Sequence, residues 1–147
     1  MGAAAVPGAA TLTVGRCPLE RSPSVAQLAA VIGERQGFIL SGRWGLPEAA
    51  PDAARVLVAG VDPAWTLGPA DDPFAALDRL PRLHHAGAAE PGVIGGGLIG
   101  WLGFGLSRTV EATLGPQPPR PHQLPNAPLA WYDDLLRRDE HGAWWVE

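Results

Sequence analysis

The fold of this chain depends on the stretch Gly95-Gly96-Gly97-Leu98-Ile99-Gly100-Trp101-Leu102-Gly103-Phe104-Gly105, in which six glycines stand among large apolar side chains. A strand carries this many glycines where another backbone approaches closely, because glycine has no Cβ to obstruct the approach. The stretch therefore predicts a strand that lies close to neighbouring backbone. Residues 106–111, which follow it, predict a short helical turn.

The same glycines raise the question of a nucleotide site, because Gly95, Gly97 and Gly100 have the spacing G-x-G-x-x-G. A dinucleotide site needs a strand before this motif, a helix directly after it and an acidic residue ~20 positions further on. Here an aromatic, glycine-rich sequence follows instead and then enters Gly115-Pro116. Close packing of strands is therefore the preferred interpretation of the three glycines.

Helix caps and apolar periodicity predict the elements on either side of this stretch. Ser24 can cap a helix whose apolar residues recur at the helical period, with Gly33 or Gly37 able to end it. Asp72 followed by Pro73 is a second N-cap signal. Runs of β-branched, apolar and aromatic residues predict strands at 11–14, 38–40, 55–60, 64–67, 129–137 and 144–146, with 64–67 pairing beside 55–60 and a turn at 139–142.

These elements predict an α+β fold, a mostly antiparallel sheet with a few short helices that forms the N-terminal half of a layered α/β sandwich. Residues 1–23 are rich in Ala, Gly and Pro, so we expect a poorly ordered segment there and a domain spanning 24–147. The sequence stops at Glu147, inside a predicted strand with no turn after it. We therefore expect that strand's sheet partners and covering layer to lie beyond Glu147.

The composition of the chain indicates which partners and which cellular compartment to expect. The formal net charge of −4 over 147 residues argues against nucleic acid, which selects a basic surface. The longest nearly apolar run, residues 93–106, is shorter than the ~20 residues of a membrane helix, so no membrane partner is expected. Cys17 is the only cysteine, which excludes an internal disulfide and fits a cytoplasmic protein. The opening residues lack the pattern of a signal peptide.

The titratable residues predict neither a catalytic set nor a metal site. Adjacent residues of a strand point apart, so the pairs Asp71-Asp72 and Asp133-Asp134 are interpreted as structural. The sequence holds no nucleophile elbow and no Walker loop. None of the histidines has metal-ligand spacing to another His or to a pair of carboxylates; they are His84, His85, His122 and His141.

Three segments in a fixed order resemble a known family. They are residues 62–63 with 72–77, the glycine-aromatic segment 96–111, and residues 124–133. Together they are similar to the N-terminal domain of component I of the chorismate-utilising synthases, the aminodeoxychorismate and anthranilate synthases. The resemblance covers roughly residues 36–147, and the family's glycine-aromatic motif falls on Gly97, Gly100, Trp101, Arg108 and Glu111.

The resemblance implies a function that this chain does not perform alone. It is closer to the aminodeoxychorismate synthase branch, in which the enzyme aminates chorismate on the route to p-aminobenzoate and folate, with ammonia from a glutamine amidotransferase subunit. In this family the chorismate site, the Mg²⁺-binding glutamates and the catalytic lysine belong to the C-terminal domain, which this sequence does not include. The chain would be a structural or regulatory N-terminal domain without a cofactor, joined to the chorismate-binding domain in cis or in trans. The anthranilate synthase branch stays open.

The resemblance also implies a tryptophan pocket, whose serine falls on Ser41 and whose arginine falls on Arg55. A hydroxyl and a guanidinium beside an apolar strand can hold the polar ends of an amino acid while its indole packs in a groove. This leaves a stand-alone tryptophan-binding module, with Trp44 as a third contact, as one alternative function. A further alternative is that the chain is the remnant of a truncated gene and has no working role. Finally, the spacing of three between Arg108 and Glu111 predicts an ion pair on one face of a turn.

Overall fold

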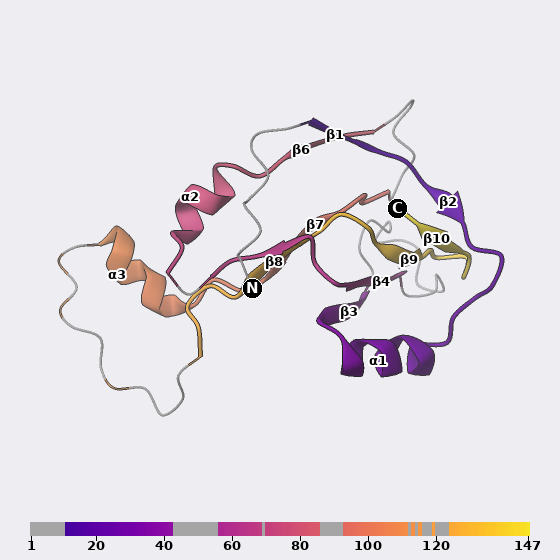
Figure 1. The fold of residues 1–147 in the computed structure, drawn as a ribbon, viewed down its shortest axis with the longest axis horizontal. Coiled ribbons are helices and arrows are strands. Elements are labelled where there is room, and N and C mark those ends of the chain that lie inside the picture. The colour runs from indigo at the N-terminus through magenta and orange to yellow at the C-terminus, as the bar shows by residue number, and fades with distance from the viewer. Residues whose placement is uncertain are drawn as a thin grey trace, which may run out of the picture.

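The computed structural model (Figure 1) describes residues 11–42, 56–68, 70–85, 93–111 and 124–147, together with Thr113, Gly115 and Pro119. Within these residues the chain forms ten short strands, three α-helices and one 3-10 helix. Every strand pair is antiparallel except one. The predicted α+β fold is therefore confirmed.

The larger sheet has the order β2-β10-β9-β4-β3 and is antiparallel throughout. Both neighbours of β10 thus belong to this chain, and the prediction that its sheet partners lie beyond Glu147 is wrong. The strands are β2 (Cys17–Pro18), β3 (Gly37–Gly42), β4 (Val56–Val61), β9 (Leu136–Arg138) and β10 (Trp144–Val146).

The second sheet has the order β5-β8-β7, with β5 at Trp65–Thr66, β7 at Gly97–Gly100 and β8 at Leu129–Tyr132. The predicted pairing of residues 64–67 beside 55–60 is wrong, because β5 pairs with β8 rather than with β4. The third sheet is the parallel pair of β1 (Thr11–Val14) with β6 (Arg82–His85). Both β1 and β2 come from the segment 1–23 that the sequence assigns to poor order.

The predicted strand 129–137 is wrong as a single element, because β8 and β9 belong to different sheets. The chain leaves β8 at Tyr132, exposes Asp133 and Asp134, and buries Leu135 before β9 begins. Two consecutive carboxylates are costly to place inside a sheet that is covered on both faces. The chain therefore crosses from one sheet to the other at this point.

Local signals place the helices. In α1 (Val25–Glu34) the Ser24 hydroxyl accepts a hydrogen bond from the Gln27 amide at 3.2 Å, and the Gln27 side chain accepts one from the Ser24 amide at 2.9 Å. This is a complete capping box, which satisfies two backbone donors that the helix cannot satisfy itself. At α2 (Pro73–Leu77) the Asp72 carboxylate is a simple N-cap, which accepts one hydrogen bond from the Phe74 amide at 2.9 Å. Both predicted caps are confirmed.

The core forms on the two faces of β4, where neighbouring side chains alternate. Val56 and Val58 pack with Ala130 and Tyr132 of β8, between the five-stranded and three-stranded sheets. On the opposite face, Leu57 and Ala59 pack with Leu28 of α1 and Trp144 of β10. Figure 1 shows α1 below the larger sheet, with β1 and β6 on the far side of the molecule. The result is a layered arrangement of helix, sheet, sheet and outer strand pair.

Candidate functional site

Of the predicted tryptophan pair, the structure describes only Ser41. Ser41 lies on β3, at the edge of the five-stranded sheet, where its side chain is exposed and it pairs with Leu57. Arg55 and Trp44 lie outside the described residues. The described residues therefore include the serine of the predicted pair but not its arginine.

The sheet register places another arginine on the same face as Ser41. Residues opposite one another in an antiparallel sheet share a face, and Leu57 is opposite both Ser41 and Arg138. The Arg138 Nε is buried and has no hydrogen-bond partner among the described residues. One row across the sheet thus joins an exposed hydroxyl, an apolar side chain and a guanidinium whose Nε has no hydrogen-bond partner among the described residues.

The glycine-rich segment approaches β8 as closely as the sequence predicts. Gly100 has φ +151°, and a Cβ there would overlap the carbonyl oxygen of Pro128. A Cβ on Gly96, whose φ is +121°, would lie 2.9 Å from the Tyr132 carbonyl oxygen. By contrast, a Cβ on Gly97 would meet nothing within 4 Å. Gly96 and Gly100 are therefore required by both conformation and space.

A buried carboxylate holds the start of this segment. The Glu147 side chain has no exposed surface and accepts hydrogen bonds from the Ile94 amide at 2.7 Å and the Gly95 amide at 3.1 Å. Two backbone donors beside glycines are the arrangement that binds anions in many proteins. Here the chain's own carboxylate takes that place, and it joins β10 to residues more than fifty positions earlier.

Arg137 supplies the opposite charge. Its guanidinium is 3.5 Å from the Glu147 carboxylate and 3.6 Å from that of Glu140, and its side chain is 4% exposed. A carboxylate this deeply buried needs both a counter-ion and hydrogen bonds to offset the loss of water. The Arg137–Glu147 pair and the two amides provide both.

The turn between β9 and β10 is held by Asp139. The Asp139 carboxylate accepts hydrogen bonds from the amides of His141 and Ala143 and from the Trp145 indole, each at 2.9 Å. Burial by itself raises the pKa of Asp139, but these hydrogen bonds outweigh it, and the pKa lies below its ordinary value. Burial also raises the pKa of the Tyr132 hydroxyl, which belongs to the core between the five-stranded and three-stranded sheets.

The second half of the glycine-aromatic segment presents large apolar side chains to solvent. Phe104, at the start of η1 (Phe104–Leu106), is 95% exposed. We use the name η1–α3 surface for the exposed apolar side chains on η1, on α3 (Ser107–Val110) and in the residues beside them. Each of its side chains is more than half exposed, and they are five of the eight exposed large hydrophobics among the described residues: Trp101, Leu102, Phe104, Val110 and Leu124.

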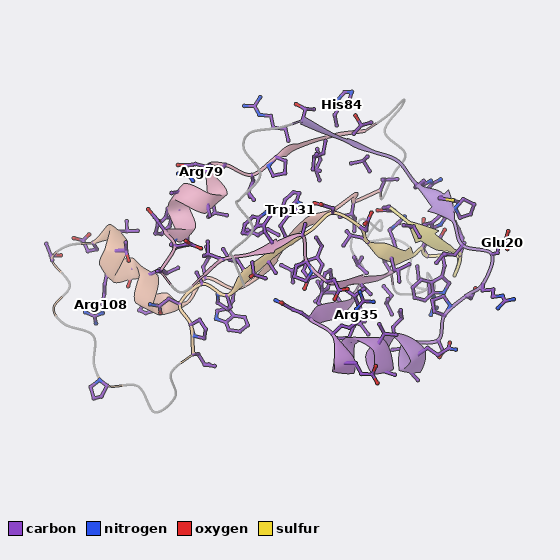
Figure 2. The ribbon with its side chains drawn as sticks, viewed as in Figure 1. Glu20, Arg35, Arg79, His84, Arg108 and Trp131 are labelled. Atoms are coloured by element: carbon purple, nitrogen blue, oxygen red, sulfur yellow. The ribbon has the colours of Figure 1, made fainter. Side chains whose placement is uncertain are left out.

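The predicted ion pair between Arg108 and Glu111 does not form. Helix α3 ends at Val110, and Glu111 has φ −112° and ψ 98°, so the helical face does not continue to it. The Glu111 carboxylate instead accepts a hydrogen bond from the Thr113 hydroxyl. Figure 2 shows Trp131 near the middle of the molecule, and Arg108 at the end opposite Glu20. The motif residues therefore extend from Gly97 and Gly100 in β7 to Arg108 in α3, at this end of the molecule.

Several cavities are lined by described residues. One of about 700 Å³ lies beside the η1–α3 surface and is lined by Leu106, Pro73 and Pro128 among others. A second, about 390 Å³, is lined by Asp133 and Glu147 among others. A third, about 300 Å³, lies between α1 and the larger sheet.

Comparison with known proteins identifies no relative. A scan against models of protein families, a search of curated proteins and a search of solved structures each return no match. No helix within the described residues is long and apolar enough to cross a bilayer. In the same part of the chain, no group of three or more His, Cys, Asp and Glu side chains is placed to hold a metal ion.

Sequence reasoning missed the Arg137–Glu147 pair. Arg137 follows Leu135 and Leu136 in an ordinary strand pattern, and Glu147 is a single acidic residue after a strand. Nothing local distinguishes them from solvated charges, because their burial results from the sheet crossing at Asp133.

Proposed function

We propose that this chain is the N-terminal domain of an aminodeoxychorismate synthase component I-like enzyme. It acts as a structural domain and is not catalytic alone. Its working partners are a chorismate-binding domain, in cis or in trans, and a glutamine amidotransferase subunit that supplies ammonia. Any Mg²⁺ requirement belongs to the chorismate-binding domain.

One observation carries this proposal: the segment with the family resemblance is also the segment that leaves apolar side chains uncovered. Phe104 exposes nearly its whole side chain, and Trp101 exposes half of its own. Exposed apolar groups that lie together mark interaction sites in soluble proteins. Burial of one such aromatic ring contributes about 1.5–3 kcal/mol. A partner domain that covers the η1–α3 surface would gain several contributions of this size.

Assembly with a catalytic domain tests the proposal. The purified chain is mixed with a separately produced chorismate-binding domain of an aminodeoxychorismate synthase component I, and complex formation is followed by sedimentation velocity. We expect a one-to-one complex that Phe104→Ser weakens at least about tenfold, because one buried ring is lost from the interface.

Val25→Ser is the matched control, because Val25 is an exposed apolar residue on α1 and lies outside the η1–α3 surface. It should leave the complex unchanged. No complex at all, or equal weakening by both variants, would overturn the proposal.

A second candidate function is a tryptophan-binding module. Ser41 supports it, because its exposed hydroxyl shares a sheet face with the Arg138 guanidinium, whose Nε lacks a partner among the described residues. Titration calorimetry with L-tryptophan separates the two functions. Saturable heat that disappears in Ser41→Ala would favour the module, and no heat would exclude it.

A further inference from the structure

The cavity between α1 and the five-stranded sheet has an apolar wall. Ile32 of α1 contributes one side, and Ala59 of β4, Leu136 of β9 and Val146 of β10 contribute the other. Ala59, whose small side chain faces α1, leaves this space open. Its volume of about 300 Å³ is at the lower end of the range for pockets that bind small molecules.

Charged residues lie at the edge of this apolar space. Arg35, directly after α1, forms an ion pair with Asp62, directly after β4, and both residues line the cavity. Asp62 has φ +50° and is the only described residue other than glycine with positive φ. Aspartate adopts this region of φ more readily than most residues do.

Asp134 adds a third charged group to this cavity. It lines both this cavity and the neighbouring one, is exposed, and makes no hydrogen bond or ion pair within the described residues. Arg35 is already neutralised by Asp62. The charged groups of the cavity therefore sum to one negative charge beside an apolar wall.

We propose that this cavity binds a small primary amine with an apolar body. The ammonium group pairs with the Asp134 carboxylate, and the hydrocarbon body lies against Ile32, Ala59 and Leu136. A carboxylate ligand is disfavoured because it would face Asp134 and Asp62, and a neutral hydrocarbon leaves Asp134 unpaired. This ligand class is separate from the proposed function, because no residue of the η1–α3 surface lines this cavity.

Titration calorimetry with 2-phenylethylamine tests the proposal, with phenylacetate as the probe of opposite charge. We expect saturable one-to-one binding of the amine and none of phenylacetate. Asp134→Asn should weaken binding about tenfold, since it removes a charge-assisted hydrogen bond. Far-ultraviolet circular dichroism of each variant confirms that the fold is retained.

Two further variants locate the site. Asp133→Asn is the matched control: Asp133 lines the neighbouring cavity with Glu147 but does not line this one. It should leave the affinity unchanged. Ile32→Trp fills the space from the helix side and should abolish binding. The proposal is overturned if 2-phenylethylamine gives no saturable heat, if phenylacetate binds equally well, or if Asp133→Asn weakens binding as much as Asp134→Asn.

Discussion

Replacing Glu147 probes the contact that ties the glycine segment to the larger sheet. Glu147→Ala leaves the Ile94 and Gly95 amides without their acceptor and leaves Arg137 with only Glu140, 3.6 Å away. Removing one partner of a buried ion pair costs about 3–5 kcal/mol. The remaining contact with Glu140 places the expected loss near the lower end of that range. The backbone hydrogen bonds between Glu147 and Leu135 are unaffected by the substitution.

Urea unfolding followed by tryptophan fluorescence measures this loss. A cost of about 3 kcal/mol lowers the unfolding midpoint by about 1.5 M if the denaturant slope is about 2 kcal/mol/M. Glu147→Gln keeps an oxygen that can accept the amide hydrogen bonds and loses only the charge, so its cost should be about 1–2 kcal/mol.

The double variant Arg137→Met with Glu147→Met removes both charges and should be more stable than Glu147→Ala, because no buried charge is left unpaired. If Glu147→Ala lowers the free energy of unfolding by less than about 0.5 kcal/mol, the carboxylate does not hold the segment. The reasoning also fails if the Gln variant loses as much as the Ala variant.

Three further predictions concern local features. Gly100→Ala should cost at least about 2 kcal/mol, since its Cβ meets the Pro128 carbonyl at positive φ, whereas Gly97→Ala should cost less than about 1 kcal/mol; urea midpoints compare them. The pKa of Asp139 is lower in the folded than in the unfolded state, so its carboxylate should stabilise the fold above the unfolded pKa of about 4. This stabilisation should disappear as the pH falls through the folded pKa. The melting temperatures of wild type and Asp139→Asn should therefore converge in acid. Ser24→Ala should cost about 1 kcal/mol in urea, and no loss would show that the capping box is energetically idle.

Features determined within a few residues could be predicted from sequence. The Ser24 and Asp72 caps form as expected, since each needs only its own side chain and an amide two or three positions away. The strand with close backbone contact at Gly100 was also predictable, because only a glycine fits there. The α+β class follows from these local elements.

Features determined over long distances could not be predicted. The apolar pattern continues through Leu135 and Leu136, so nothing in it marks the passage from one sheet to the other at Asp133. The pairing of β5 with β8 and the burial of Glu147 both depend on that passage. Of the predicted tryptophan pair, only Ser41 lies within the described residues, so that site remains a prediction.

Formation of 4-amino-4-deoxychorismate from chorismate and an ammonium salt tests the scaffold role most directly. Three samples are compared: this chain, a chorismate-binding domain produced alone, and the two combined. We expect no product from this chain and at least about tenfold more from the combined sample than from the catalytic domain alone, by analogy with other sites assembled by docking. Turnover by the 147-residue chain alone, or a combined rate no higher than that of the catalytic domain, would contradict the account.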